Sequence, residues 1–268
     1  MRQWALPESV LAAAPEAPWG FPTELFRSRA ELATPGALTF ANRTARDALP
    51  SGGAVLDVGV GAGAASIPLH PSCGLITGVD SSSELLAEFQ QQARRVGVAA
   101  LPVAGAWPEV APQVSIADVV VCNHVVYNVA DLAPFVVALS AHARRRVVLE
   151  LTNRHPTAWM ADLWLRFHAL PRPTRPDSDD AASLIRGLGY DVRRHAAVVP
   201  RRPGGFRRRE DAVASIRRRL CLDAARDEAV AEALGDRLAR YGDYWSAAGP
   251  LEPLVTLWWD MDGTVAGT

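Results

Sequence analysis

The sequence predicts an α/β fold built on parallel strands, and two observations support this prediction. Short apolar runs rich in β-branched residues, such as residues 55–58 and 117–122, alternate with segments whose apolar residues recur at helical spacing. The first run leads into three glycines at alternate positions, which is typical of a tight turn between a strand and a helix. Strand–helix–strand units need long crossovers, so we expect their strands to lie parallel in one sheet.

The stretch Asp57-Val58-Gly59-Val60-Gly61-Ala62-Gly63 is the strongest functional signal in the sequence. Glycine has no Cβ, so a ligand can approach the backbone closely and positive φ is permitted. We expect a helix to follow the glycines and to run to about Leu69, before Pro71. Its N-terminus would offer unpaired N–H groups to a polar or anionic ligand. The stretch therefore predicts a binding loop for a nucleotide-type cofactor.

Two cofactor classes fit this loop. The pattern Gly59-x-Gly61-x-x-Ala64 fits the dinucleotide fingerprint, with alanine as the third small residue. The pattern Asp57-x-Gly59-x-Gly61-x-Gly63 more closely resembles the first motif of class I S-adenosylmethionine (SAM) methyltransferases. A carboxylate at Asp57 would repel a pyrophosphate, but it would not repel the cationic sulfonium cofactor. We therefore favour SAM, and an NAD-dependent oxidoreductase is the alternative.

The remaining elements can be placed along the chain. The sequence predicts strands over residues 74–80, 98–103, 117–122, 146–151, 190–199 and 254–259. It predicts helices over residues 38–49, 85–96, 132–139, 159–170, 178–188, 207–220 and 227–241. We interpret residues 1–268 as a single domain with an N-terminal lid or cap (1–35), a cofactor-binding core (36–200), a helical insertion (201–250) and a closing strand (251–268).

The second strand and the two segments after it supply further candidate cofactor residues. Asp80 ends that strand about 20 residues beyond the glycines, where a carboxylate can accept hydrogen bonds from both ribose hydroxyls. In Gly105-Ala106-Trp107-Pro108, Ala106 stands near the place where such methyltransferases often carry an acidic residue beside the adenine. Trp107 either covers the base or is a core residue. Ser81 and Asn123 complete the predicted cofactor site.

These motifs, in this order, resemble a class I SAM-dependent methyltransferase over residues 36–200 and the final strand. The run from Val119 to Val129, with Glu150-Leu151-Thr152 and His155-Pro156, is similar to a group of actinobacterial methyltransferases of unassigned substrate. The resemblance implies a Rossmann-like, seven-stranded, mostly parallel sheet with helices on both faces and an antiparallel last strand. It also implies that the cofactor binds at the carboxyl ends of the strands, which is the general rule for open α/β sheets.

Methyl transfer from SAM requires an acceptor to be positioned and, for a hydroxyl, a proton to be removed. His124 follows the central strand, and an imidazole suits this proton removal near neutral pH; the alternative is a histidine that hydrogen-bonds a loop backbone. His155 is a second candidate base, and Tyr127 could orient the acceptor. The Asn-Pro-Pro-aromatic or Asp-Pro-Pro-aromatic signature of transfer to base amino groups is absent, because Asn123 is followed by His124-Val125-Val126.

Composition limits the other classes. The chain of 268 residues is 49% hydrophobic and 21% charged with a net charge of −1, which is typical of a folded protein and gives no global basic field for nucleic acid or a membrane. Ten arginines against two acids gather in residues 193–219, where we expect a solvated face paired with acids elsewhere. The three cysteines have no disulfide or metal-ligand spacing, so we predict no metal. No signal peptide or bilayer-length apolar run is recognisable, which favours the cytoplasm.

The sequence thus predicts an enzyme that methylates a small molecule, most simply at oxygen. A non-catalytic SAM-binding protein is the other alternative, because the sequence shows no compelling catalytic dyad.

Overall fold

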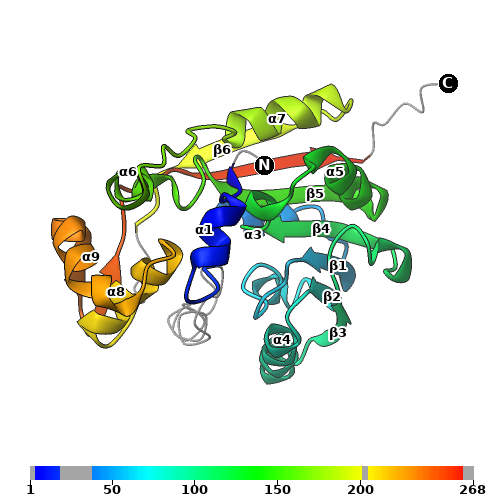
Figure 1. The fold of residues 1–268 in the computed structure, drawn as a ribbon. Helices are drawn as coiled ribbons and strands as arrows, with labels where there is room; N and C mark the ends of the chain where they lie inside the picture. The colour runs from blue at the N-terminus through cyan, green and yellow to red at the C-terminus, as the bar shows by residue number, and fades with distance from the viewer. Residues whose placement is uncertain (1–3, 19–37, 201–204, 262–268) are drawn as a thin grey trace.

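The computed structural model describes residues 4–18, 38–200 and 205–261, and within these it forms a seven-stranded sheet (Figure 1). The strand order is β3-β2-β1-β4-β5-β9-β6. The strands are β1 (Gly53–Val58), β2 (Cys73–Asp80), β3 (Ala99–Ala104), β4 (Ala117–Asn123), β5 (Ala143–Thr152), β6 (Arg193–Ala197) and β9 (Leu254–Asp260).

Strands β1 to β5 pair in parallel, and β9 runs antiparallel between β5 and β6. The central strand β4 is apolar along its length because both of its faces are buried, and Val119 and Val120 are fully inaccessible to solvent. The predicted mostly parallel sheet with an antiparallel last strand is therefore confirmed. The carboxyl ends of β1, β2, β4 and β5 meet at one edge of the sheet.

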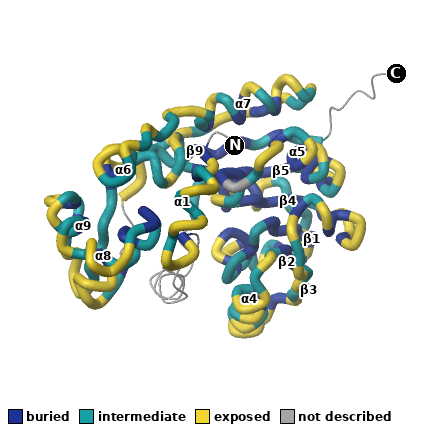
Figure 2. The backbone as a smooth tube through the Cα atoms, in the orientation of Figure 1, coloured by how far each residue is buried: buried dark blue, intermediate teal, exposed yellow. Residues whose placement is uncertain are grey.

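Helices cover both faces of the sheet, so the two faces have separate apolar layers. One layer contains α5 (Leu132–Ala141) and α7 (Ser178–Gly187), which pack on residues such as Leu149 and Trp259. The other contains α3 (Phe40–Arg46) and α4 (Ser83–Val96), which pack on Val55, Val121 and Val148. Figure 2 shows the resulting buried interior between the helices. This two-faced arrangement fixes which side chains can meet at the carboxyl edge.

A third apolar cluster lies beside the sheet. It joins α6 (Ala161–His168), α8 (Arg209–Arg219) and α9 (Asp227–Leu234) with Leu6, which precedes α1 (Glu8–Ala13) (Figure 1). Residues 19–35 of the predicted N-terminal lid, with residues 201–204 and 262–268, lie outside the described residues. Each helix among the described residues is too short or too polar to cross a membrane.

The predicted helix over residues 227–241 is wrong in its second half. Helix α9 ends at Leu234, and Gly235 follows with φ of +51°, a backbone conformation that a continuing helix cannot contain. After the turn η7 (Gly235–Arg237), the chain forms a hairpin of β7 (Leu238–Tyr241) and β8 (Tyr244–Ala247). Gly242, with φ of +59°, makes the hairpin turn, and this glycine was the missed signal.

The predicted helix after the glycine loop is also wrong. Residues 61–66 form successive turns. Between these turns and β2, the regular structure is the three-residue 3-10 helix η2 (Ile67–Leu69). Gly61 and Gly63 both have positive φ, at +53° and +89°, so the backbone of this segment leaves the helical region. A helix N-terminus is therefore not part of this loop.

Several arginines of the arginine-rich segment are paired with acids from other elements, as expected. The ion pairs are Arg193 with Asp260 (3.0 Å), Arg194 with Asp179 (3.1 Å), and Arg217 with Glu16 and Asp227 (both 2.9 Å). These pairs neutralise part of the local charge, and Arg217 is itself buried.

The packing predicts that Phe89→Ala destabilises the fold. Phe89 is fully buried, and its ring lies 3.0 Å from the Cβ position of Gly63 and 2.7 Å from that of Gly78, so it fills the space that both glycines leave. We expect a loss of about 3–5 kcal/mol in the free energy of unfolding, measured by urea denaturation. Leu165→Ala, at a 58% exposed position, is the control and should cost under about 0.5 kcal/mol. Equal losses in the two variants would contradict this account of the core.

Candidate active site

The glycine loop is held against the end of β2 by its own backbone. The N–H groups of Gly59 and Val60 both donate to the carbonyl oxygen of Val79, at 2.8 and 3.0 Å. Gly59 has φ of +75°, and a Cβ there would lie 2.1 Å from Val125, so only glycine fits. Gly61 is different, because a Cβ there would meet no atom within 4 Å and would project into open space. The loop is thus rigidly placed and open at Gly61.

Asp80 connects this loop to the second strand. Its Oδ2 accepts a hydrogen bond from the Gly61 N–H and its Oδ1 accepts one from the Ser82 N–H, both at 2.9 Å. Each carboxylate oxygen can accept further hydrogen bonds, so Asp80 keeps acceptor capacity. Ser81 is exposed beside it. The cap of α4 is Ser82, whose hydroxyl accepts from the Leu85 N–H.

Asp57 is a buried carboxylic acid without a hydrogen-bond partner. Its side chain is fully inaccessible to solvent, and neither oxygen has a partner among the described residues. Burial, helped by the charge of Asp80, raises its pKa to about 7, although the nearby Ser66 hydroxyl opposes this rise. Asp57 can therefore change its charge near neutral pH.

Two more buried acceptor oxygens lie on the same face of the sheet. Asn123 ends β4 and its Oδ1 has no partner among the described residues. Asn123 is paired in register with Glu150 of β5, whose Oε2 also has no partner there. By strand alternation, Asp57, Asn123 and Glu150 share the face of Val55, Val121 and Val148, which α3 covers. Together they form what we call the acceptor set.

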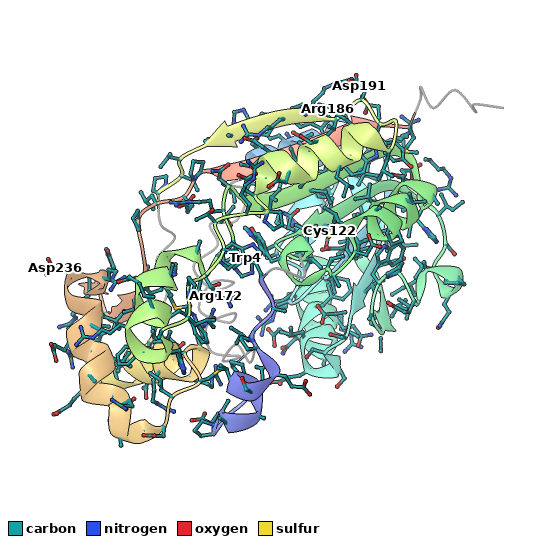
Figure 3. The ribbon with its side chains drawn as sticks, turned by 45° about the horizontal axis from the view of Figure 1, so that its top comes forward. Trp4, Cys122, Arg172, Arg186, Asp191 and Asp236 are labelled. Atoms are coloured by element: carbon teal, nitrogen blue, oxygen red, sulfur yellow. The ribbon has the colours of Figure 1, made fainter. Side chains whose placement is uncertain are left out.

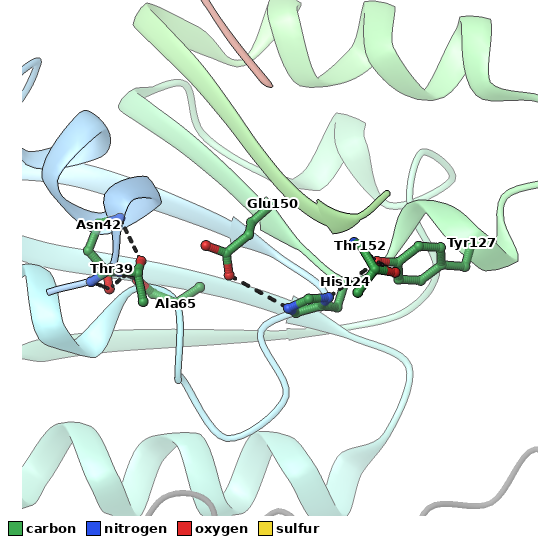
Figure 4. Close-up of polar contacts among 7 residues, drawn as sticks. All are labelled: Thr39, Asn42, Ala65, His124, Tyr127, Glu150 and Thr152. Carbon is green, nitrogen blue, oxygen red and sulfur yellow. Dashed lines mark hydrogen bonds and ion pairs between the residues drawn. The ribbon is translucent and has the colours of Figure 1, made fainter. Parts of the chain in front are cut away.

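His124 lies at the centre of a polar chain that leaves this set (Figure 4). Its Nε2 is 3.6 Å from Glu150 Oε1, and its Nδ1 is 3.3 Å from the Tyr127 hydroxyl. Its backbone N–H donates to the Glu150 carbonyl oxygen at 2.7 Å, and its φ of +61° is unusual for a residue with a side chain. The side chain remains 47% exposed. His124 is therefore held in place and accessible.

Tyr127 continues the chain to the end of β5. Its hydroxyl accepts a hydrogen bond from the Thr152 N–H and lies 2.9 Å from Thr152 Oγ1. Burial raises the pKa of Tyr127 to about 12, although both contacts with Thr152 oppose the rise. Tyr127 therefore keeps its proton at neutral pH and acts as a hydrogen-bond donor rather than as a base.

His155 has a different environment from His124. Its ring stacks on Trp4 at 4.3 Å and meets the edge of Tyr127 at 5.6 Å. Burial and the charge of Arg172 lower its pKa to about 4, and its Nδ1 accepts from the N–H of Thr157 at 3.2 Å. Figure 3 shows Trp4 and Arg172 beside each other between the sheet and the helices α8 and α9. His155 is neutral here and anchors the N-terminal segment.

The two residues predicted to lie beside the adenine, in the loop after β3, differ in their exposure to solvent. Ala106 is exposed, whereas Trp107 is 9% exposed and packs in the apolar layer of α5. The Trp107 ring meets His142 edge-on at 5.0 Å, and its Nε1 has no partner among the described residues. This position agrees with the core interpretation of the Trp107 side chain.

Glu150 contacts His124 in the structure but was not among the site residues that the sequence predicted. It is the one charged residue in the buried run Val147-Val148-Leu149-Glu150-Leu151, and an acid inside such a run was the available signal. Its contact with His124 depends on the pairing of β4 with β5, which the sequence does not state.

Residues 55–145, from β1 to the beginning of β5, match the sequence family described as a methyltransferase domain. Over this segment the chain has a methyltransferase domain. The match covers the glycine loop, Asp80 and the end of β4, so it supports the methyltransferase interpretation of the predicted motif. The absence of a helix N-terminus in residues 61–66 agrees, because a pyrophosphate would need those N–H groups.

Solved structures show the same fold. The YcgJ protein of Bacillus subtilis is 14% identical, with 83% of this chain and 98% of that chain covered and a TM-score of 0.54. A putative methyltransferase from Bacillus halodurans C-125 is 11% identical, with 88% and 99% covered and a TM-score of 0.54. At these identities the likeness concerns the fold alone. No curated protein sequence matches the chain.

SAM is the cofactor that a methyltransferase domain implies, and the residues at the carboxyl edge fit it. The cofactor is cationic, and the acceptor set offers buried oxygens with no partner among the described residues. Its ribose needs a carboxylate beside the loop, where Asp80 lies, and its approach needs a glycine with open space, which Gly61 provides.

The raised pKa of Asp57 predicts a pH-dependent stability that Asp57→Asn removes. Its folded-state pKa of about 7 lies above the unfolded value of 3.8, so the ligand-free fold is favoured below pH 4 and loses this contribution as pH rises to about 7. The difference in unfolding free energy between Asp57→Asn and the natural protein should therefore grow by about 1.4 kcal/mol per pH unit in this window. Urea denaturation at pH 5, 6, 7 and 8 measures it. A difference that stays constant with pH would contradict the buried, unpartnered state of Asp57.

Proposed function

We propose that this protein transfers the methyl group of SAM to an oxygen atom of a small-molecule acceptor, with His124 as the general base. One observation carries the proposal: an accessible imidazole is held at the end of β4, on the same edge of the sheet as the glycine loop and the acceptor set. A histidine can accept a hydroxyl proton at neutral pH.

For the cofactor we propose roles that follow from the geometry. Asp80, with Ser81 beside it, would hold the ribose hydroxyls, and the glycines of the loop (Gly59, Gly61 and Gly63) would line the cofactor. Asp57 and Asn123 would face the ammonium group of its amino-acid part, since their buried oxygens have no other partner among the described residues. In the loop after β3, the exposed Ala106 would lie beside the adenine, whereas the Trp107 side chain belongs to the core.

When bound, SAM supplies an electrophilic methyl group for in-line displacement. The task of the chain is then to align the acceptor oxygen and to take its proton. His124 would take the proton, and Tyr127, whose hydroxyl lies 3.3 Å from His124 Nδ1, would help to orient the acceptor. His155 is the weaker candidate base, because a pKa of about 4 makes it a poor proton acceptor at pH 7.

We also propose that residues 4–18 and 205–250 help to select the acceptor. Trp4 stacks on His155, whose edge meets Tyr127, so the N-terminal segment reaches the neighbourhood of His124 through three successive rings. Arg172 adds its guanidinium over the rings of Trp4 and Trp164, at 5.9 and 5.4 Å. A small molecule with a flat or apolar body would suit such surroundings.

The cofactor site predicts that Gly61→Val blocks binding of S-adenosylhomocysteine, the demethylated cofactor. The new side chain would occupy the open space at Gly61, so we expect the Kd from calorimetric titration to rise at least about tenfold. Gly97→Val is the matched control, since Gly97 also has positive φ (+78°) and open space but caps α4 away from the loop. Asp80→Ala should weaken binding as well.

A parallel titration with NADH completes this test. Binding of S-adenosylhomocysteine alone is expected, and equal weakening by Gly61→Val and Gly97→Val would mean that backbone strain, not the cofactor site, is responsible.

The base assignment predicts that His124→Asn slows methyl transfer with little effect on cofactor binding. General-base catalysis contributes about 10²- to 10⁴-fold, so a loss of this size is expected in transfer of labelled methyl from SAM to acceptors in a cell extract. The Kd for S-adenosylhomocysteine should change less than about threefold, because the cofactor residues are untouched. Full activity in His124→Asn would remove His124 from the mechanism.

A further inference from the structure

Glu150 has features that its place in the core does not explain. Its side chain is 8% exposed, within a strand whose neighbouring side chains are fully buried and apolar. Burying a carboxylate costs several kcal/mol unless other groups compensate it. Among the described residues, Oε2 has no hydrogen-bond partner, and the contact of Oε1 is with the His124 ring. A purely structural role gives no reason for an acid at this position.

The backbone brings His124 to this carboxylate and keeps it there. The N–H of His124 donates to the Glu150 carbonyl oxygen at 2.7 Å, and the φ of +61° turns the side chain out of the strand direction. Such a conformation is unfavourable for a residue with a Cβ. The separation of 3.6 Å between Nε2 and Oε1 is an ionic contact that is slightly longer than a hydrogen bond. Catalytic contacts are often long before substrates bind.

The other ring nitrogen of His124, Nδ1, faces the Tyr127 hydroxyl, which can donate its proton to Thr152 instead. Tyr127 Oη lies 3.3 Å from His124 Nδ1 and 2.9 Å from Thr152 Oγ1. Thr152 Oγ1 donates its own proton to the Arg154 carbonyl oxygen at 2.6 Å, so it can accept the proton of Tyr127. Nδ1 can therefore be released from Tyr127 without leaving that hydroxyl unpaired.

We propose that Glu150 is a positioning residue that holds His124 in the tautomer with the proton on Nε2, so that Nδ1 is the atom that takes the acceptor proton. An ionised carboxylate can only accept hydrogen bonds, so the ring nitrogen facing it must carry the proton. The inference rests on the proposed function and identifies which nitrogen of the base acts.

The proton and electron balance of the step is simple. The acceptor O–H bond breaks and its proton bonds to Nδ1, while the oxygen bonds to the methyl carbon. The methyl–sulfur bond breaks and its electron pair stays on sulfur. His124 then carries a positive charge, which the Glu150 carboxylate stabilises. The imidazolium later returns its proton to water.

The test is nitrogen NMR of the full chain labelled with 15N-histidine, recorded at pH 8. His124 is assigned by the signal that disappears in His124→Gln. We expect the natural protein to show His124 with protonated Nε2 and unprotonated Nδ1. In Glu150→Gln this preference should be lost and both tautomers should appear, because a neutral amide can either donate or accept.

The controls separate this effect from a structural one. Glu252→Gln removes an acid of similar burial (20% exposed) that pairs with Arg154, and His124 should keep its tautomer. His155 is an internal standard, because its Nδ1 accepts from the Thr157 N–H and should stay unprotonated in every variant. Glu150→Asp keeps the charge and should preserve part of the preference. If Glu150→Gln does not fold, the tautomer of the natural protein and of Glu150→Asp still decides.

Two outcomes would overturn the inference: His124 protonated on Nδ1 in the natural protein, or an unchanged tautomer in Glu150→Gln. Neither depends on methyl transfer. Failure of the proposed function would appear separately, as no binding of S-adenosylhomocysteine in the calorimetric titration.

Discussion

The proposed site depends on buried acceptor oxygens that have no partner among the described residues, at the carboxyl edge of the sheet. Asp57, Asn123 and Glu150 lie on one face, at or near the ends of three neighbouring parallel strands. Leaving such groups unpaired costs free energy, which the apolar layers on both faces of the sheet offset. A positively charged ligand would satisfy these oxygens. The cost of these unpaired oxygens therefore links the stability of the sheet to the positive charge of the proposed cofactor.

Much of the sheet could be predicted because buried parallel strands leave a clear pattern. The runs ending at Asp57, Asp80 and Cys122 are apolar on both faces, and each appears in the structure as a strand of the core. The antiparallel position of β9 came from the resemblance to a known family, since its sequence alone does not state a direction. The alternating glycines predicted a ligand-binding loop because glycine permits positive φ, and Gly59, Gly61 and Gly63 all have positive φ in the structure.

What could not be predicted depends on contacts between distant segments or on single backbone angles. Small residues after Gly61 suit either a helix or turns, and the structure has turns. Residues 227–241 have a helical apolar pattern, but Gly235 and Gly242 divide them into a helix and a hairpin. The neighbours of His124 come from β5 and from the following turn, so they become visible only when the pairing of Asn123 with Glu150 is known.

The two faces of the sheet supply different polar groups to the proposed site, and His124 contacts a group from each face. Glu150 belongs to the face of α3, where the proposed cofactor residues Asp57 and Asn123 also lie, whereas Tyr127 packs in the layer of α5. A residue in a regular strand can point to one face only. The positive φ of His124 removes it from the strand, so its ring can contact a carboxylate on one side and a hydroxyl on the other. The strained backbone is thus the means by which one side chain can serve both the charged and the hydroxyl-bearing side of the site.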